Sequence, residues 1–148
     1  MMRQTTSDQE LELLDSILEH MIPASEDGRM PGAGSVGFWT YVESKGEASW
    51  ICSGLALLLE AASAEFGLPF SQLSMVGRTE FIAAQRRKQF RFFSRLTHQV
   101  IECYYQDARV LRAIGLETRP PFPDGFRALD GDLSLLEPVF IRGKIYRG

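Results

Sequence analysis

The sequence predicts an all-α protein, a compact bundle of about five to six helices with an irregular, proline-rich C-terminal tail that wraps around it. Three observations predict this fold class. Apolar residues recur at intervals of three and four over most of the first 118 positions. Serine and aspartate stand where these segments begin, and glycine and proline stand where they end. No segment shows the apolar–polar alternation of a half-buried strand.

The size and charge of the chain limit its function. Its 148 residues, 45% of them hydrophobic, fit a single domain, with a helical core at about 8–118 and an extended tail at 119–148. The net charge of −3 gives no general attraction to nucleic acid or to an anionic membrane. The longest apolar stretch, Ile51 to Ala62, is shorter than the roughly 20 residues that span a bilayer.

The N-terminus shows no export signal in its sequence. The residues MMRQTTSDQE lack a basic segment, an apolar stretch and a cleavage site in succession. We therefore expect a cytoplasmic chain, or a periplasmic one if a signal was removed or if the chain is exported with a partner.

A first helix is predicted from Asp8 to Met21. Ser7 and Glu10 match a capping box, in which each side chain binds the backbone amide of the other residue. Leucine, isoleucine and methionine then recur at helical spacing with acidic residues between them. Pro23 ends the helix.

Two further helices follow a loop over residues 23–35. A short aromatic helix is expected at 37–44, and a longer one from about Ala48 to Phe66. The longer helix is apolar around most of its circumference, which predicts a central helix buried on several sides. Gly67 and Pro69 provide its stop.

The remaining helices are predicted between residues 71 and 114. A fourth begins at Ser71 or Ser74 and runs through Arg86, and a fifth runs from about 88 to 105, either separately or as one kinked helix. Asp107 is a suitable N-cap for a sixth helix at 108–114. The Pro-rich segment at 119–125 breaks regular structure, and in residues 133–148 we expect a wrapping tail with about one helical turn.

One segment spells a nucleotide-binding motif. Residues 32–37, GAGSVG, match G-x-G-x-x-G, but a dinucleotide site needs a strand before this loop and a helix after it. Here a helix and a proline-containing loop come first. We therefore predict a tight turn into the aromatic helix and no cofactor site.

No catalytic or metal-binding residue is predicted. His20 and His98 have no neighbouring ligand cluster, and no G-x-S-x-G elbow is present. Cys52 and Cys103 lie in apolar helical segments, which favours buried free thiols over a disulfide. Glu60, within the apolar helix, is expected to reach the helix rim or pair with arginine, the alternative being an acid or base of raised pKa.

Basic residues form a stripe on the fourth and fifth helices. Arg87, Arg91 and Arg95 recur every four residues, beside Arg86 and Lys88. Three interpretations stay open: a solvated face, pairing with the acidic face of the first helix, or contact with an acidic partner or phosphates.

Three blocks of sequence resemble one known family. The segment MIPASEDGRMPGAG at 21–34 resembles the "IIP…PGA" entry of the gluconate 2-dehydrogenase subunit 3 family, and YYQDARVLRAIG at 104–115 resembles its "YY-x-D-P-x-V" block. The segment PPFPDGF at 120–126 is similar to its Pro-rich continuation. The departures are Ala108 in place of the usual proline and the absence of a twin-arginine signal.

The resemblance implies an accessory role. Family members are small, non-catalytic subunits that fold, stabilise or export a large FAD-dependent subunit of the glucose-methanol-choline type, which oxidises sugar or alcohol hydroxyls and often passes electrons to a cytochrome c subunit. FAD is then expected on the partner and no cofactor on this chain. The alternatives are a small helical enzyme with an inter-helix cleft, using Glu60, His98 or Tyr105, and a nucleic-acid or regulatory module using the arginine stripe.

A partner surface is predicted where aromatic residues and arginine gather. These positions lie in the short aromatic helix, the second family-like block and the tail. They are Phe38, Trp39, Tyr41, Tyr104, Tyr105, Phe140, Arg142, Tyr146 and Arg147.

Overall fold

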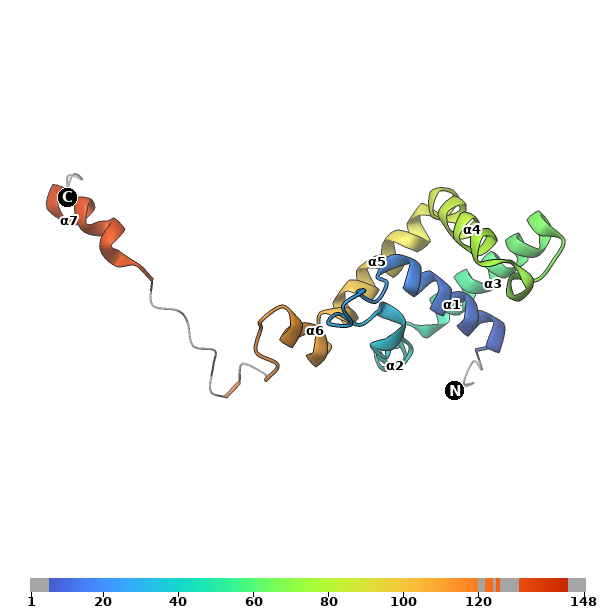
Figure 1. The fold of residues 1–148 in the computed structure, drawn as a ribbon, viewed down its shortest axis with the longest axis horizontal. Coiled ribbons are helices and arrows are strands. Elements are labelled where there is room, and N and C mark those ends of the chain that lie inside the picture. Colours follow the sequence, from blue (N-terminus) through green and yellow to red (C-terminus); the bar gives the residue numbers. More distant parts are fainter. Residues whose placement is uncertain (1–5, 120–121, 124, 126–130, 144–148) are drawn as a thin grey trace. The chain divides into compact units, whose positions relative to one another are not determined.

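The computed structural model describes residues 6–119, 122–123, 125 and 131–143 of the chain. These residues form helices and contain no β-strand, which confirms the all-α fold (Figure 1). The α-helices are α1 Asp8–Met21, α2 Phe38–Ser44, α3 Ala48–Phe66, α4 Met75–Lys88, α5 Phe90–Tyr104, α6 Ala108–Ala113 and α7 Glu137–Arg142. Three short 3-10 helices are η1 Ala33–Ser35, η2 Phe70–Gln72 and η3 Leu133–Leu136.

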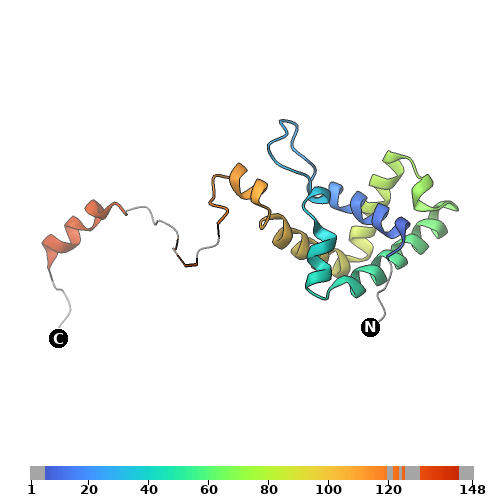
Figure 2. The same cartoon turned by 90° about the horizontal axis from the view of Figure 1, so that it is seen from below.

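The chain divides into two units, Met1–Thr118 and Arg119–Gly148. In the first unit α4 and α6 lie at opposite ends of α5, and α1 lies beside α3 (Figures 1 and 2). Helix α1 begins with the predicted capping box, since Ser7 N donates to Glu10 Oε2 at 2.8 Å and Glu10 N donates to Ser7 Oγ at 3.3 Å. Both bonds satisfy amides that a helix N-terminus leaves free.

The core centres on α1. The prediction that α3 is the central helix, buried on several sides, was wrong. Helix α1 packs against α3, α4, η1 and η2 and buries Leu13, Leu14, Ile17 and Leu18. Helix α3 buries one face only, and Leu57 on its other face is 58% exposed. Apart from Leu57, this outer face consists of small or polar residues. The helix is so hydrophobic on average that its sequence did not reveal this face. Its members are Ser53, Ala56, Glu60, Ser63 and Ala64.

Helices α4 and α5 are separate, with a break at Gln89 (φ −112°, ψ 47°). Ser74 is the N-cap of α4, and its hydroxyl accepts from Gly77 N at 3.1 Å. Just before it, η2 inserts Phe70 into the core, where the ring lies 6.0 Å from that of Phe81. Phe70 was not expected, because a single aromatic in a loop carries no periodic signal.

The second unit holds more helix than predicted. Residues 133–142 form η3 and α7, and each described side chain from 131 to 143 is exposed. Asp132 caps η3 by accepting from Ser134 N at 3.0 Å, and Pro138 occupies an early helix position, where proline needs no amide partner. The prediction that the tail wraps around the bundle stays a prediction.

Candidate functional site

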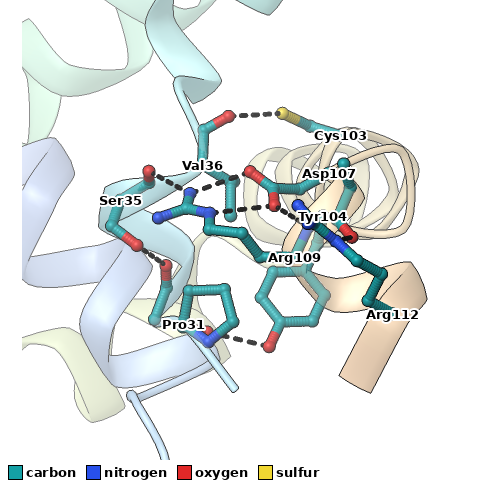
Figure 3. A network of polar contacts seen from close by, with 10 residues as sticks. Pro31, Ser35, Val36, Cys103, Tyr104, Asp107, Arg109 and Arg112 are labelled. Carbon is teal, nitrogen blue, oxygen red and sulfur yellow. Dashed lines mark hydrogen bonds and ion pairs between the residues drawn. The ribbon is translucent and has the colours of Figure 1, made fainter. Parts of the chain in front are cut away.

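The two best-described family-like segments meet in space. The Tyr104 hydroxyl, at the end of α5, donates to the Pro31 carbonyl at 2.8 Å (Figure 3). The Arg109 guanidinium, on α6, donates to the Ser35 carbonyl at 2.7 Å. We call this contact between residues 31–36 and 103–112 the motif junction. It attaches the entry loop to the end of α5 through residues more than 70 positions apart.

Asp107 organises the α6 side of the motif junction. As predicted it is the N-cap of α6, accepting from Arg109 N at 2.8 Å, and its other oxygen accepts from Arg109 Nη2 at 2.8 Å. The Arg109 guanidinium holds the pKa of the Asp107 carboxyl down to about 2, with the backbone amides of Arg109 and Val110 adding to the effect. The side chain is therefore ionised at neutral pH, and it orients the arginine that reaches Ser35.

The glycines of residues 32–37 shape the loop side of the junction. Gly37 is the N-cap of α2 with φ +72°, a left-handed conformation that favours glycine. A Cβ on Gly32 would lie 2.5 Å from Glu19 Oε1 and 3.0 Å from Ala24 N, so the loop needs this glycine to pack against α1. The predicted tight turn is confirmed, and the chain before it is loop and helix.

A groove runs along α5 on the surface of the first unit. One hollow of about 480 Å³ is lined by Arg86, Arg87, Phe90 and Thr97, among others. A second, of about 280 Å³, is lined by Arg86, Thr97, Ile101 and Tyr105, with Met21 and Ile22 from the end of α1. Because Arg86 and Thr97 line both, we treat them as one surface, the α5 groove.

The arginine stripe divides into paired and unpaired members. Arg95 forms an ion pair with Glu47 and stacks on Trp50, 4.3 Å from the ring centre. Lys88 lies 3.5 Å from Glu65. The alternative that the stripe pairs with the acidic face of α1 is wrong for Arg95 and Lys88. Their partners are Glu47, the residue before α3, and Glu65, which lies in α3. Among the described residues, the remaining members have no hydrogen-bond or ion-pair partner. They are Arg86, Arg87 and Arg91.

A separate hollow of about 420 Å³ lies between α1 and α4. It gathers Glu12, Asp15, Glu19 and His20, a group that the sequence analysis missed because the other side of the hollow is supplied by α4. Glu12 is bound by Arg78 at 2.7 Å, and burial raises the pKa of the Asp15 carboxyl. The Arg78–Glu12 ion pair joins α4 to α1. We therefore assign these two side chains to the packing of the two helices.

A known protein family matches most of the chain. The profile of gluconate 2-dehydrogenase subunit 3 matches residues 8–116. The chain belongs to the gluconate 2-dehydrogenase subunit 3 family. Neither a search of curated proteins nor a search of solved structures gives a match. The subunit 3 match ends close to the boundary between the two units of the chain.

Membership in the subunit 3 family describes the chain as a subunit of a dehydrogenase complex. Both sides of the motif junction lie within the matched residues. Two of the three segments that gave the resemblance are therefore joined to each other, and the Tyr104 and Arg109 side chains that join them hold this subunit's own fold together.

The structure places the predicted partner residues in different environments. Phe38 and Tyr104 are 2% and 3% exposed, so the folded subunit offers neither to a partner, and the interface prediction is corrected at these two positions. Both rings fill the core, where an aromatic side chain removes a large apolar area from water. Tyr105 is 50% exposed and lines the α5 groove.

Trp39 and Tyr41 on α2 are partly buried. The Tyr41 hydroxyl donates to Glu102 at 2.8 Å, and Lys45 binds the same carboxylate at 2.9 Å. These bonds lower the pKa of Glu102 and fasten α2 to α5. In the tail, Phe140 and Arg142 are exposed, while Tyr146 and Arg147 lie outside the described residues.

The candidate groups for an inter-helix enzyme do not converge in the part of the chain that the structure describes. Glu60 is exposed on the outer face of α3, as expected for a rim position. His98 contacts Glu102 at 3.4 Å, and Tyr105 lines the α5 groove. Within the described ranges no cluster of three or more His, Cys, Asp or Glu is arranged for a metal ion. No helix there is long and apolar enough to cross a membrane.

Proposed function

We propose that this chain is a non-catalytic accessory subunit that binds and stabilises the large FAD-dependent subunit of a sugar or alcohol dehydrogenase. Family membership supports the subunit role. In this proposal FAD belongs to the large subunit, of the glucose-methanol-choline type, and a cytochrome c subunit receives the electrons. This chain contributes surface to the complex.

The observation that carries the proposal is the amount of apolar side chain left in water. In the first unit Phe90 and Ile101 of α5 are exposed, and so is Tyr105, which directly follows this helix. In the second, Leu135 and Phe140 are more than 70% exposed. Exposed apolar side chains that gather in one place, as Phe90, Ile101 and Tyr105 do in the α5 groove, are characteristic of sites that bind another protein. Covering them by a partner stabilises both chains, because burial of apolar surface is favourable.

The test is capture of the tagged chain from its native host, followed by mass spectrometry and a flavin absorbance scan of the eluate. We expect a large flavoprotein dehydrogenase subunit at a stoichiometric level, and we expect its soluble yield to fall when the gene for this chain is deleted. The tag fused to an unrelated helical protein is the control. An eluate without a flavoprotein would overturn the proposal.

A further inference from the structure

The α5 groove combines an apolar floor with a basic rim. Its floor includes Phe90 and Phe93 at one end and Val100 and Ile101 toward the other. Phe90 is 70% exposed although it begins a helix whose other aromatic residues pack inward. Neither of the two hollows that form the groove is lined by aspartate or glutamate. The lining therefore suits apolar side chains and disfavours cations.

The rim carries positive charge that the described part of the chain leaves uncompensated. Arg86 and Arg87 line the groove, and Arg91, near the start of α5, has no hydrogen-bond or ion-pair partner among the described residues. Arg95 and Lys88 on the same two helices are each neutralised by a glutamate. The whole chain has a net charge of −3, so the excess of positive charge at the groove is local. A carboxylate brought to the rim would gain charge-assisted hydrogen bonds with the guanidinium groups.

The length of the groove fits a segment of secondary structure. It follows α5, Phe90–Tyr104, whose 15 residues extend about 22 Å at 1.5 Å per residue. An amphipathic helix of similar length can lie in such a groove with its apolar face down, as in other helix-in-groove complexes. Its acidic residues would then face Arg86 and Arg87.

Charge favours a protein occupant over a polyanion. The end of α1 closes the groove with Met21 and Ile22, and the hollow on α1 carries Asp15 and Glu19 besides the Glu12 that Arg78 neutralises. These acids would repel a phosphate backbone or an anionic membrane extending beyond the rim. A short segment with a few carboxylates avoids this repulsion.

We infer that the α5 groove binds an amphipathic, acidic segment of the large dehydrogenase subunit, with Phe90 and Tyr105 on its apolar face and Arg86 and Arg87 on its carboxylates. This inference rests on the proposed function and names the part of the chain that would perform it. The aromatic anchors would supply most of the affinity and the arginines the orientation.

The experiment compares full-length tagged variants captured from the native host. The groove variants are Phe90→Ser and the double charge reversal R86E/R87E. The matched controls are Leu57→Ser, another exposed apolar residue, and Arg29→Glu, another exposed arginine. Circular dichroism and thermal unfolding of each purified variant confirm that the fold is kept.

We expect each groove variant to recover at least tenfold less flavoprotein than wild type, and the controls to recover within twofold. Recovery by wild type should also fall as the wash salt is raised, because the rim contacts are ionic. Full recovery by both groove variants, with wild type positive, would overturn the inference and leave the proposed function intact. Binding of wild type to vesicles of anionic phospholipid, lost in R86E/R87E, would also overturn it. If wild type itself captures no flavoprotein, the proposed function has failed.

Discussion

The motif junction and the α5 groove are built from the same kinds of residue and use them differently. At the junction, the Tyr104 hydroxyl and the Arg109 guanidinium each bind a backbone carbonyl of the entry loop. In the groove, Phe90 is exposed and Arg86 has no partner among the described residues. Residue type alone therefore does not identify a partner surface. The two regions differ in whether the polar groups of these side chains find hydrogen-bond partners, and their rings find packing partners, within the chain itself.

The largest expected difference lies between two aromatic residues of α5. Tyr104→Ala should lower the free energy of unfolding by about 3 to 5 kcal/mol, because it opens a cavity in the core. Phe90→Ala should change it by less than about 0.5 kcal/mol, because its ring is mostly in water. Urea unfolding followed by circular dichroism measures both. Equal losses would show that Phe90 belongs to the core.

The loop side of the junction can be tested with two glycines. Gly32→Ala should cost about 1 to 3 kcal/mol, since its Cβ would press on a backbone nitrogen as well as on the Glu19 side chain. Gly77→Ala, inside α4 with only ordinary contacts around its Cβ, should gain about 0.5 to 1 kcal/mol. Thermal unfolding should give shifts of opposite sign. A harmless Gly32→Ala would mean that the loop is not closely packed on α1.

The Asp107–Arg109 pair predicts a pH dependence. The pKa of Asp107 is lowered to about 2 in the folded chain from an ordinary value near 3.8, so its contribution is complete above about pH 4 and is lost as pH falls toward 2. Asp107→Asn keeps an N-cap residue and removes the charge. It should cost about 1 kcal/mol at pH 7 and progressively less as pH falls from 4 through 2, because the carboxyl that it replaces becomes protonated in the unfolded chain and then in the folded one. A difference that does not change with pH would exclude this electrostatic role.

The smallest expected effect compares two arginines of the stripe. Arg95→Ala should cost about 0.5 to 1 kcal/mol, because it removes an exposed ion pair with Glu47 and the stacking on Trp50. Arg87→Ala, which removes no hydrogen bond or ion pair within the described residues, should change the unfolding free energy by less than about 0.5 kcal/mol. Parallel urea titrations decide this. A comparable loss at Arg87 would reveal an internal partner for the groove rim.

Local features of this chain were predictable from sequence, and the pairing of its helices was not. The bounds of α1 and α3, the capping box at Ser7 and the Asp107 cap follow from patterns within a few residues, and each is present. Which face of α3 is exposed to solvent depends on where the other helices pack against it. The hydrophobicity of its sequence does not contain this information. The burial of Tyr104 depends on the entry loop, whose contact lies 73 positions away.

The candidate site divides in the same way. The resemblance to the subunit 3 family was readable from short blocks, and two of these lie within residues 8–116, which the family profile matches, while the block at 120–126 lies beyond them. The α5 groove was not predicted, because it requires the end of α1 to lie beside residues 97–105. A partial signal existed, since Phe90 and Ile101 fall off the buried face of α5.

The two cysteines have a practical consequence for studying assembly. Cys52 and Cys103 are free and buried, as predicted, and burial together with the charge of Asp107 raises the pKa of the Cys103 thiol. Alkylating reagents attack the exposed thiolate, so modification requires the helices to open first. The rate at which the cysteines of the natural chain are labelled therefore reports how often the helices around them open. A partner subunit bound along α5 would lower the labelling rate of Cys103, so assembly can be followed without an engineered probe.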